Sequence, residues 1–400
     1  MGLPWQCGPV LSSAAFAEVT RRAIFDCCKW HLQVGDLPVL CPFPLVLSPE
    51  TWIDLCRMSE CLARESLAAE EELLARPELH RLLGLPAELR GSFSRAQATT
   101  GPRVIRFDFH WTSEGWRISE ANADVASGYI EGSGFTQLLP AHYPNLRATG
   151  DPAGALASAL ARAANGGAVG LMHLPQYTED RQIMLYVARR LEERQAPTCL
   201  LSPGHVNWRD GRAFSTADQS AGPLSAILRF YPAEWLPRLP ATAQWRTFFA
   251  GGQTPVCNPG SAVLTQSKRF PLVWDKLHTP LPTWRTLLPP TCSPTDVPKQ
   301  GEKEWVWKPA LGHEGNNVVV AGAVEVEEWK RITLAARRRS AEWVAQRRFD
   351  IVPLPTPEGP YYPCVGVYMI DGQVAGAYGR LAQQPLIDQF AREIAVLVSE

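Results

Sequence analysis

The chain has 400 residues, of which 46% are hydrophobic and 20% are charged, the balance of a soluble globular protein with two or three packed subdomains. Its formal net charge of −1 gives no sign of the basic face that nucleic-acid binding normally calls for, so no nucleic-acid partner is expected. No apolar run approaches the roughly 20 residues of a membrane-spanning helix, and no secretory signal is expected, so no membrane partner is predicted either.

The ten cysteines form no Cys-x-x-Cys pair, which argues against a zinc knuckle and a thioredoxin-like motif. Cys27, Cys28, Cys56 and Cys61 fall in helical patterns and are interpreted as small, buried apolar groups. These features predict a reduced, cytoplasmic protein.

The first hundred residues are predicted to form a helical region. Residues 1–45 are rich in Pro and Cys and are expected to be irregular. A helix should follow, with Ser48 as its N-cap and Pro49 at its first position. The region ends at the polar stretch 97–102.

From residue 103 the pattern changes to strand-like alternation. Residues 104–110 and 116–122 predict two strands joined by the turn Ser113-Glu114-Gly115. An α/β unit should come next, followed in the sequence by a linker rich in Pro and Gly. We expect its strands at 168–174, 198–202 and 225–230, its helix at 179–194 and the linker at 232–260.

The last part of the chain predicts a second α/β arrangement. We expect strands at 305–307, 318–320 and 343–346, a helix at 326–339, a hairpin turning at Asp371-Gly372, and a short closing helix near 387–396. The predicted fold class is α/β (α+β), divided into a helical region (1–100), a metal-binding hairpin with an α/β subdomain (101–250) and a nucleotide-binding subdomain (251–400).

The hairpin carries the first chemical signal. Arg106, Asp108 and His110 alternate with apolar residues and therefore share one face. With a three-residue turn, Asp108 falls opposite Glu120, and two facing carboxylates repel one another unless a cation separates them. Together with the amide oxygen of Asn122 they form an oxygen-ligand set suited to Mg²⁺. A solvated face, with Arg106 paired to Asp108, explains the spacing equally well.

The second signal is Lys308, which follows an apolar strand and precedes a loop containing Gly312 and Gly315. A lysine there can act as a point charge on phosphate oxygens, and the glycines would let backbone N–H groups approach them. The loop is not a P-loop, since no Gly-Lys-Ser/Thr follows. An ordinary turn with a surface lysine remains the simpler alternative. Lys268 and Arg380 carry no signal by themselves.

Taken together, these segments resemble the glutathionylspermidine synthase family of ATP-grasp ligases. The resemblance rests on five stretches in the family's order, at 106–124, 177–181, 265–268, 307–318 and 362–380. The first is the most specific and contains Arg106-Phe-Asp-Phe-His and Ile118-Ser-Glu-Ala-Asn-Ala-Asp. The bifunctional members' extra cysteine amidase domain has no room in this chain.

The resemblance implies an ATP-grasp fold, ATP and Mg²⁺ as cofactors, and a role for each matching residue. Mg²⁺ would be held by Asp108, Glu120 and Asn122. ATP would contact Lys268, Lys308, the glycine loop with Gly312 and Gly315 and, beside the adenine, Gln346. Arg106 and Arg380 would face the reacting carboxylate and acyl phosphate, and Ser127 would touch the carboxyl substrate.

The function implied is that of a ligase that activates a peptide or amino-acid carboxylate as an acyl phosphate and joins it to an amine. The sequence identifies neither substrate and does not indicate the oligomeric state. If the amine is a polyamine, the candidate contacts are Glu131, Glu179, Asp180 and Glu234. His313 stands in the glycine loop where relatives often have Arg, and its effect on specificity stays open. Two alternatives also remain: an ATP-grasp kinase of a small alcohol, and a non-catalytic nucleotide-binding protein.

Overall fold

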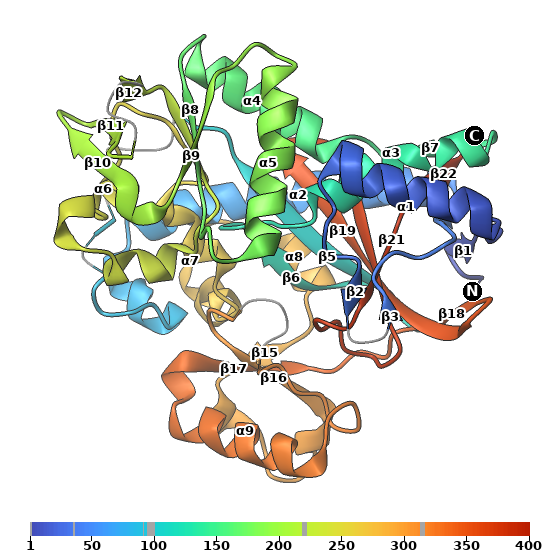
Figure 1. The fold of residues 1–400 in the computed structure, drawn as a ribbon. Helices are drawn as coiled ribbons and strands as arrows, with labels where there is room; N and C mark the ends of the chain where they lie inside the picture. Colours follow the sequence, from blue (N-terminus) through green and yellow to red (C-terminus); the bar gives the residue numbers. More distant parts are fainter. Residues whose placement is uncertain (1, 35–36, 91, 94–100, 218–221, 313–316) are drawn as a thin grey trace.

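The computed structural model describes residues 2–34, 37–90, 92–93, 101–217, 222–312 and 317–400. They form a mixed α/β structure with several sheets, consistent with an ATP-grasp-like fold (Figure 1). The helices are α1 (Ser13–Cys27), α2 (Pro49–Leu74), α3 (Thr136–Leu138), α4 (Pro152–Ala164), α5 (Thr178–Glu192), α6 (Thr247–Ala250), α7 (Val263–Gln266), α8 (Pro282–Leu287) and α9 (Val326–Arg338).

The strands up to residue 229 are β1 (Trp5–Cys7), β2 (Gln33–Val34), β3 (Leu37–Pro38), β4 (Leu45–Leu47), β5 (Val104–Thr112), β6 (Gly115–Asn122), β7 (Leu146–Ala148), β8 (Val169–Met172), β9 (Thr198–Leu201), β10 (Val206–Arg209), β11 (Arg212–Ser215), β12 (Pro223–Leu224) and β13 (Ala226–Arg229). Those that follow are β14 (Val256–Cys257), β15 (Thr291–Cys292), β16 (Trp305–Pro309), β17 (Trp343–Arg347), β18 (Leu354–Thr356), β19 (Gly359–Ile370), β20 (Gln373–Ala382), β21 (Arg392–Ile394) and β22 (Val396–Ser399).

The central antiparallel sheet has the order β21-β20-β19-β5-β6, with β18 added beside β19. Alternation along β5 places the fully buried Phe107 and Phe109 in the apolar core that includes helix α2. Ser48 caps that helix as predicted, because its hydroxyl accepts a hydrogen bond from the backbone N–H of Thr51. The polar residues of β5 therefore lie on the opposite face of the sheet.

The predicted hairpin is confirmed, but its register arises differently from the prediction. The turn has two residues, since Thr112 pairs with Gly115, and not three. A β-bulge at Ser119 then shifts the ladder by one residue, so that Asp108 still faces Glu120. Bulges re-aim side chains beside functional sites, and here Ser119 and Glu120 both reach the same cavity.

The predicted α/β unit is confirmed as a parallel sheet of order β14-β13-β8-β9. Helices α4 and α5 pack against each other and against this sheet (Figure 1). The strands are short, continuous apolar runs, which is typical of a parallel sheet buried on both faces. Helix α5 begins with Glu179 and Asp180 in its first turn, where carboxylates interact favourably with the helix dipole.

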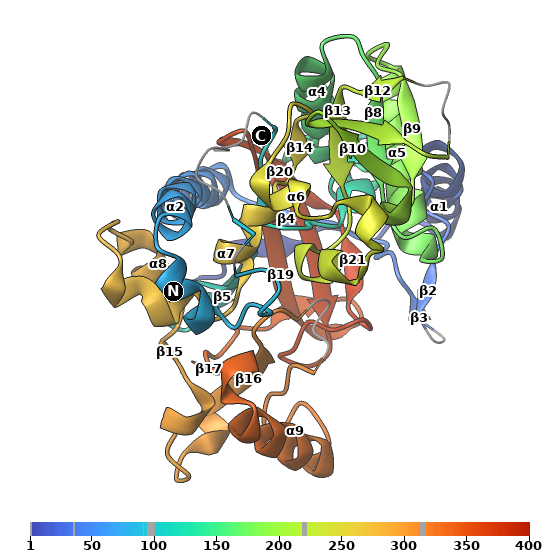
Figure 2. The same ribbon diagram turned by 90° about the vertical axis from the view of Figure 1, so that its left-hand side faces the viewer.

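The third unit is a small antiparallel sheet, β15-β17-β16, covered by α9. We call these elements the lid, because Figures 1 and 2 show them projecting from the rest of the molecule. The predicted strand at 318–320 is reduced to an isolated bridge between Trp307 and Val319. The lid has its own small core, which includes Trp307 and Ile332.

Both ends of the chain differ from the sequence-based expectation. Residues 1–45 are not irregular throughout, because they contain α1, capped by Ser12, and strands β1, β2 and β3. The closing helix near 387–396 is wrong: β21 and β22 are strands, and β22 pairs with β4 and β7. Periodicity alone cannot distinguish a short apolar helix from a buried strand, and partners distant in sequence decide the outcome here.

The segment 232–260 is not a linker. Its aromatic side chains, among them Trp245, Phe248 and Phe249, are buried in the main core, although its Pro and Gly content predicted turns. The division into 1–100, 101–250 and 251–400 stays a prediction, and the sheets join strands from all three ranges. Within the described ranges, no helix is both long and apolar enough to cross a membrane.

Candidate functional site

A cavity of about 950 Å³ lies where the polar face of the central sheet meets the lid and the start of α5. It brings together most of the predicted site residues, which come from distant parts of the chain: Arg106, Glu120, Asn122, Ser127, Lys268, Lys308, Gly312, Gln346 and Arg380. Asp108 is 1% exposed and does not line the cavity. The predictions for Gly315 and His313 fall outside the described residues.

Asp108 is enclosed by two arginines. Arg106 donates to it from Nε (2.7 Å to Oδ1) and Nη2 (3.0 Å to Oδ2), a bidentate pair buried on both sides. Arg380 donates to Oδ2 at 3.1 Å from β20, which is separated from β5 by β19, and Asn122 Nδ2 lies 3.3 Å from the same oxygen. Because Asn122 turns its amide nitrogen toward Asp108, its carbonyl oxygen points away from that carboxylate.

Arg106 is held as firmly as Asp108. Its remaining terminal nitrogen donates to the carbonyl oxygen of Ser127 at 2.6 Å, and the Tyr368 hydroxyl donates to that same oxygen. The guanidinium also lies over the rings of Tyr368 and Tyr378, 6.0 and 5.3 Å from their centroids. Arg106 therefore fixes Asp108 and the Ser127 loop in place, whereas Arg380 borders the cavity with its side chain 18% exposed.

Glu120 and Lys268 form the second charged pair, at 3.0 Å between Oε2 and Nζ. Burial by itself would raise the pKa of Glu120, but the charges of Lys268 and Lys308 and the hydrogen bond from Lys268 lower that pKa to about 2. Lys268 also donates to the carbonyl oxygen of Gly312 at 2.8 Å, so it links the hairpin to the glycine loop. Glu120 is thus an ionised carboxylate facing the cavity.

Lys308 lies at the end of β16, where Nζ donates to the backbone oxygen of Ser119 (3.0 Å) and to Oε1 of Gln346 (2.7 Å). Burial lowers the pKa of Lys308 to about 8, although Glu120 opposes the shift and Lys268 adds to it. Gln346 is oriented in turn by Thr291 Oγ1, 3.3 Å from its Nε2. The two lysines thus reach the cavity from different elements.

His110 and Ser119 form a polar pair that was not singled out from the sequence. His110 Nδ1 lies 3.1 Å from the carbonyl oxygen of Pro363, which only accepts, so Nδ1 carries the proton. Burial lowers the pKa of His110 to about 4, although Asp108 opposes the shift, so Nε2 has a free lone pair for the Ser119 hydroxyl at 3.1 Å. His110 stood on the predicted polar face, but the bulge that brings Ser119 to it leaves no sequence signal.

Another part of the cavity wall is acidic and aromatic. Glu179 and Asp180 line it, together with Trp30, Tyr177 and Trp235. Glu179 also pairs with His31 at 2.5 Å. These aromatic residues come from separate segments of the chain, and their spacing in the sequence predicted no common site.

The four predicted polyamine contacts separate into two groups. Glu179 and Asp180 line the cavity, whereas Glu131 pairs with the buried Lys29 elsewhere and Glu234, 9% exposed, does not line it. Within the described residues, no three His, Cys, Asp or Glu side chains are grouped as a metal site. The predicted metal set has only two carboxylates and an amide, so its role stays a prediction.

A family model for the glutathionylspermidine synthase preATP-grasp region matches residues 50–399, which is most of the chain. The chain belongs to this family. Family membership confirms the resemblance found in the sequence.

Two comparisons add detail. A protein of Haemophilus influenzae named "Putative acid–amine ligase" is 28% identical over 169 residues, which is 40% of this chain and only 38% of that protein. The solved apo structure of a glutathione synthetase-like effector from Globodera pallida superposes with a TM-score of 0.65, covering 96% of this chain and 97% of that one at 10% identity. The second likeness establishes a shared fold.

Proposed function

We propose that this protein is an ATP-dependent acid–amine ligase, which activates a peptide or amino-acid carboxylate as an acyl phosphate and joins it to an amine. The observation that carries the proposal is the gathering of two arginines and two lysines around Asp108 and Glu120 at one cavity. Family membership and the name of the Haemophilus relative support it. The chemistry uses no protein nucleophile, in keeping with the absence of a Gly-x-Ser-x-Gly motif from the sequence.

The positive charge of the site suits the phosphates of a nucleoside triphosphate. Lys268, Lys308 and Arg380 line the cavity, and the two carboxylates compensate only part of the positive charge. Lys268 and Lys308 would each bind phosphate oxygens as a point charge, and Gly312 would leave room for backbone contact. Gln346, on the lid strand β17, accepts a hydrogen bond from Lys308 and is proposed to adjoin the base, as the family resemblance implies.

The oxygen atoms of Glu120 and Asn122 that face the cavity would also suit Mg²⁺ as ligands. Glu120 is ionised, and Asn122 directs its carbonyl oxygen away from Asp108. Oxygen ligands of this kind hold Mg²⁺ together with waters and phosphate oxygens, and the ion would neutralise charge on the phosphoryl group in transfer. Asp108 is the weakest of the three predicted ligands, because Arg106 and Arg380 occupy its oxygens.

The chain's own residues would mainly position charged groups that repel one another. Arg380 would orient the substrate carboxylate; in support, it borders the cavity and Asp108 fixes one side of its guanidinium. Arg106 would act less directly, by fixing Asp108 and the loop that carries Ser127. Ser127 lines the cavity and is proposed as a contact of the acid substrate.

The amine would be recognised at the acidic and aromatic part of the wall. A protonated amine is attracted both to carboxylates and to the faces of aromatic rings. Glu179, Asp180, Trp30 and Tyr177 supply both kinds of group within the same cavity. Glu131 and Glu234 are no longer proposed as contacts, because they do not line it.

An ADP-release screen over pairs of carboxylates and amines tests this function. We expect ADP release that needs both substrates and Mg²⁺, and a loss of that release in Glu120→Gln. A phosphorylated alcohol as the stable product would favour the kinase alternative. ATP binding without ADP release over the whole panel would favour the non-catalytic one.

A further inference from the structure

Four consecutive residues, beginning with the last residue of α7, are almost fully buried, and together they contact several parts of the molecule. Gln266, Ser267 and Arg269 are 7%, 2% and 7% exposed, and the Lys268 side chain is 9% exposed. We call residues 266–269 the junction. Lys268 is assigned to the nucleotide site, but the other three residues have no role in the proposed chemistry.

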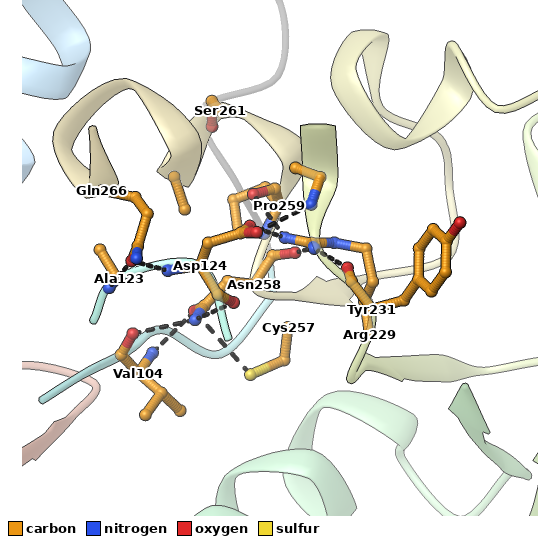
Figure 3. Close-up of polar contacts among 12 residues, drawn as sticks. Val104, Ala123, Asp124, Arg229, Tyr231, Cys257, Asn258, Pro259, Ser261 and Gln266 are labelled. Atoms are coloured by element: carbon orange, nitrogen blue, oxygen red, sulfur yellow. Dashed lines mark hydrogen bonds and ion pairs between the residues drawn. The ribbon is translucent and has the colours of Figure 1, made fainter. Parts of the chain in front are cut away.

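Gln266 connects the junction to the end of the hairpin. Its Oε1 accepts from two consecutive backbone N–H groups, Ala123 at 2.6 Å and Asp124 at 3.0 Å (Figure 3). These groups directly follow Asn122 at the end of β6. Because both partners are donors, only an acceptor serves at this position. Gln266 therefore sets how far the end of β6 lies from Lys268.

The same strand end is fixed from its other side by a buried polar network. Asp124 pairs with Arg229 of β13, both side chains being 0% exposed, and accepts from the N–H of Ala233 at 2.8 Å. Asn258 Nδ2 donates to the carbonyl oxygens of Val104 (2.9 Å) and Asp124 (3.2 Å), as Figure 3 shows. Gln266 is the side chain that joins this strand end to the segment carrying Lys268.

Arg269 connects the junction to the lid. Its Nη1 donates to the carbonyl oxygens of Ser340 (2.5 Å) and Trp343 (2.6 Å), at the start of β17, and its Nε donates to Leu82 at 2.8 Å. The backbone N–H of Lys268 adds a bond to Ala310 of the lid at 2.9 Å. A guanidinium that binds only carbonyl oxygens on two separate bodies holds them in one relative position.

We propose that Gln266 and Arg269 are positioning residues of the nucleotide and metal site. Gln266 holds the hairpin end bearing Asn122 beside Lys268, and Arg269 holds the lid that carries Lys308 over it. The inference rests on the proposed function, because it assigns these positions to Mg²⁺ and ATP. Two distinct effects follow, one on the Mg²⁺ requirement and one on ATP affinity.

The test measures ATP binding to the full chain by calorimetry over a Mg²⁺ series, without acid or amine, so that no turnover is needed. Gln266→Met removes the acceptor and should raise the Mg²⁺ concentration for half-maximal binding by about tenfold or more, the usual effect of losing an outer partner of a metal ligand. Arg269→Met should weaken ATP binding at saturating Mg²⁺ by about tenfold, a loss of about 1.4 kcal/mol, and leave the Mg²⁺ midpoint unchanged.

The chain offers a matched control for each variant. Gln182 is 2% exposed, and its Oε1 also accepts from two consecutive N–H groups, those of Trp30 and His31, so Gln182→Met should leave the Mg²⁺ midpoint unchanged. Arg337 bonds only within the lid, to Pro294, Val297 and Glu302, so Arg337→Met should not reproduce the Arg269 effect. Gln266→Glu keeps the acceptor and should restore the wild-type Mg²⁺ midpoint.

Wild-type midpoints and affinities in both variants, with only a lower melting temperature, would overturn the inference and leave the proposed function standing. A wild-type chain that binds no ATP at any Mg²⁺ concentration would remove the proposed function and the inference together. Gln266→Asn and Arg269→Lys, which withdraw the same contacts by shortening or reshaping the side chain, replace either methionine variant that does not fold. The same two effects are expected of them.

Discussion

At the residue scale, partners decide which charged groups act on a ligand and which support others. Asp108 was predicted as a metal ligand, but its oxygens already accept hydrogen bonds from Arg106, Arg380 and Asn122. Glu120 keeps its charge in a buried site because Lys268 and Lys308 outweigh burial. The sequence predicted these residue types and the polar face of β5, but side-chain partners from β20 and the junction depend on the tertiary fold.

Lys308 predicts a pH dependence of ATP binding. Its pKa of about 8 lies below the ordinary lysine value, so most of the group is charged at pH 7, about half at pH 8 and little at pH 9. If only the charged form binds phosphate, affinity should fall by about tenfold between pH 7 and pH 9, measured by calorimetry. Lys308→Arg stays charged throughout this range and should show a flat profile. A falling profile in that variant would assign the titration elsewhere.

For Arg380 we expect a replacement to lower turnover far more than ATP binding. Because it borders the cavity and is proposed to orient the carboxylate, Arg380→Ala should lower kcat by about a hundredfold or more, the scale of losing one group that stabilises transition-state charge. ATP affinity should change by only a few-fold. The check compares kcat with the ATP dissociation constant once a substrate pair is known. Unchanged turnover would remove Arg380 from the catalytic set.

For Arg106 we expect a replacement to lower mainly the stability of the fold. It is 3% exposed and holds both the buried Asp108 and the Ser127 loop, so Arg106→Met leaves a buried carboxylate with one arginine fewer. The free energy of unfolding should fall by about 3 kcal/mol, the scale found when one partner of a buried pair is removed. Urea unfolding measures this. A loss below about 1 kcal/mol, with full loss of turnover, would show that Arg106 acts on the substrate.

At the element scale, the hairpin shows how much its sequence determined and what it left open. Alternation in 104–110 predicted the polar face, and the pairing of Asp108 with Glu120 was correct. The route to that pairing was not, because a two-residue turn and a bulge at Ser119 together give the register of a three-residue turn. A bulge depends on cross-strand contacts such as His110 with Ser119, which local pattern does not reveal.

The bulge predicts that two deletions differ. Deleting Ser119 removes the bulge and keeps Asp108 opposite Glu120, so the chain should still unfold cooperatively with a modest drop in melting temperature. Deleting Ala121 instead would absorb the bulge by moving Glu120 opposite Phe107, turning a carboxylate toward the core. That variant should fail to fold, as judged by circular dichroism. Equal behaviour of the two deletions would contradict the register argument.

At the scale of the whole molecule, the site is assembled from residues 106 to 380 by pairings that are distant in sequence. Arg380 lies on β20, and β19 pairs with both β20 and β5, so Arg380 comes close to the polar residues of β5. The lid brings Lys308 over the hairpin. Sequence order and motif resemblance predicted the members of this set. They did not predict the cavity's aromatic wall or the strands at the chain's end, because those depend on which distant segments become neighbours.

The central claim is that the protein activates a carboxylate by phosphoryl transfer. The most direct measurement is trapping with hydroxylamine: the protein, Mg²⁺ and ATP are incubated with a panel of peptide and amino-acid carboxylates, and hydroxamates are detected by mass spectrometry. We predict a hydroxamate of at least one acid, formed with stoichiometric ADP and absent from Glu120→Gln. ADP formation without any hydroxamate, accompanied by a stable phosphorylated alcohol, would contradict the claim.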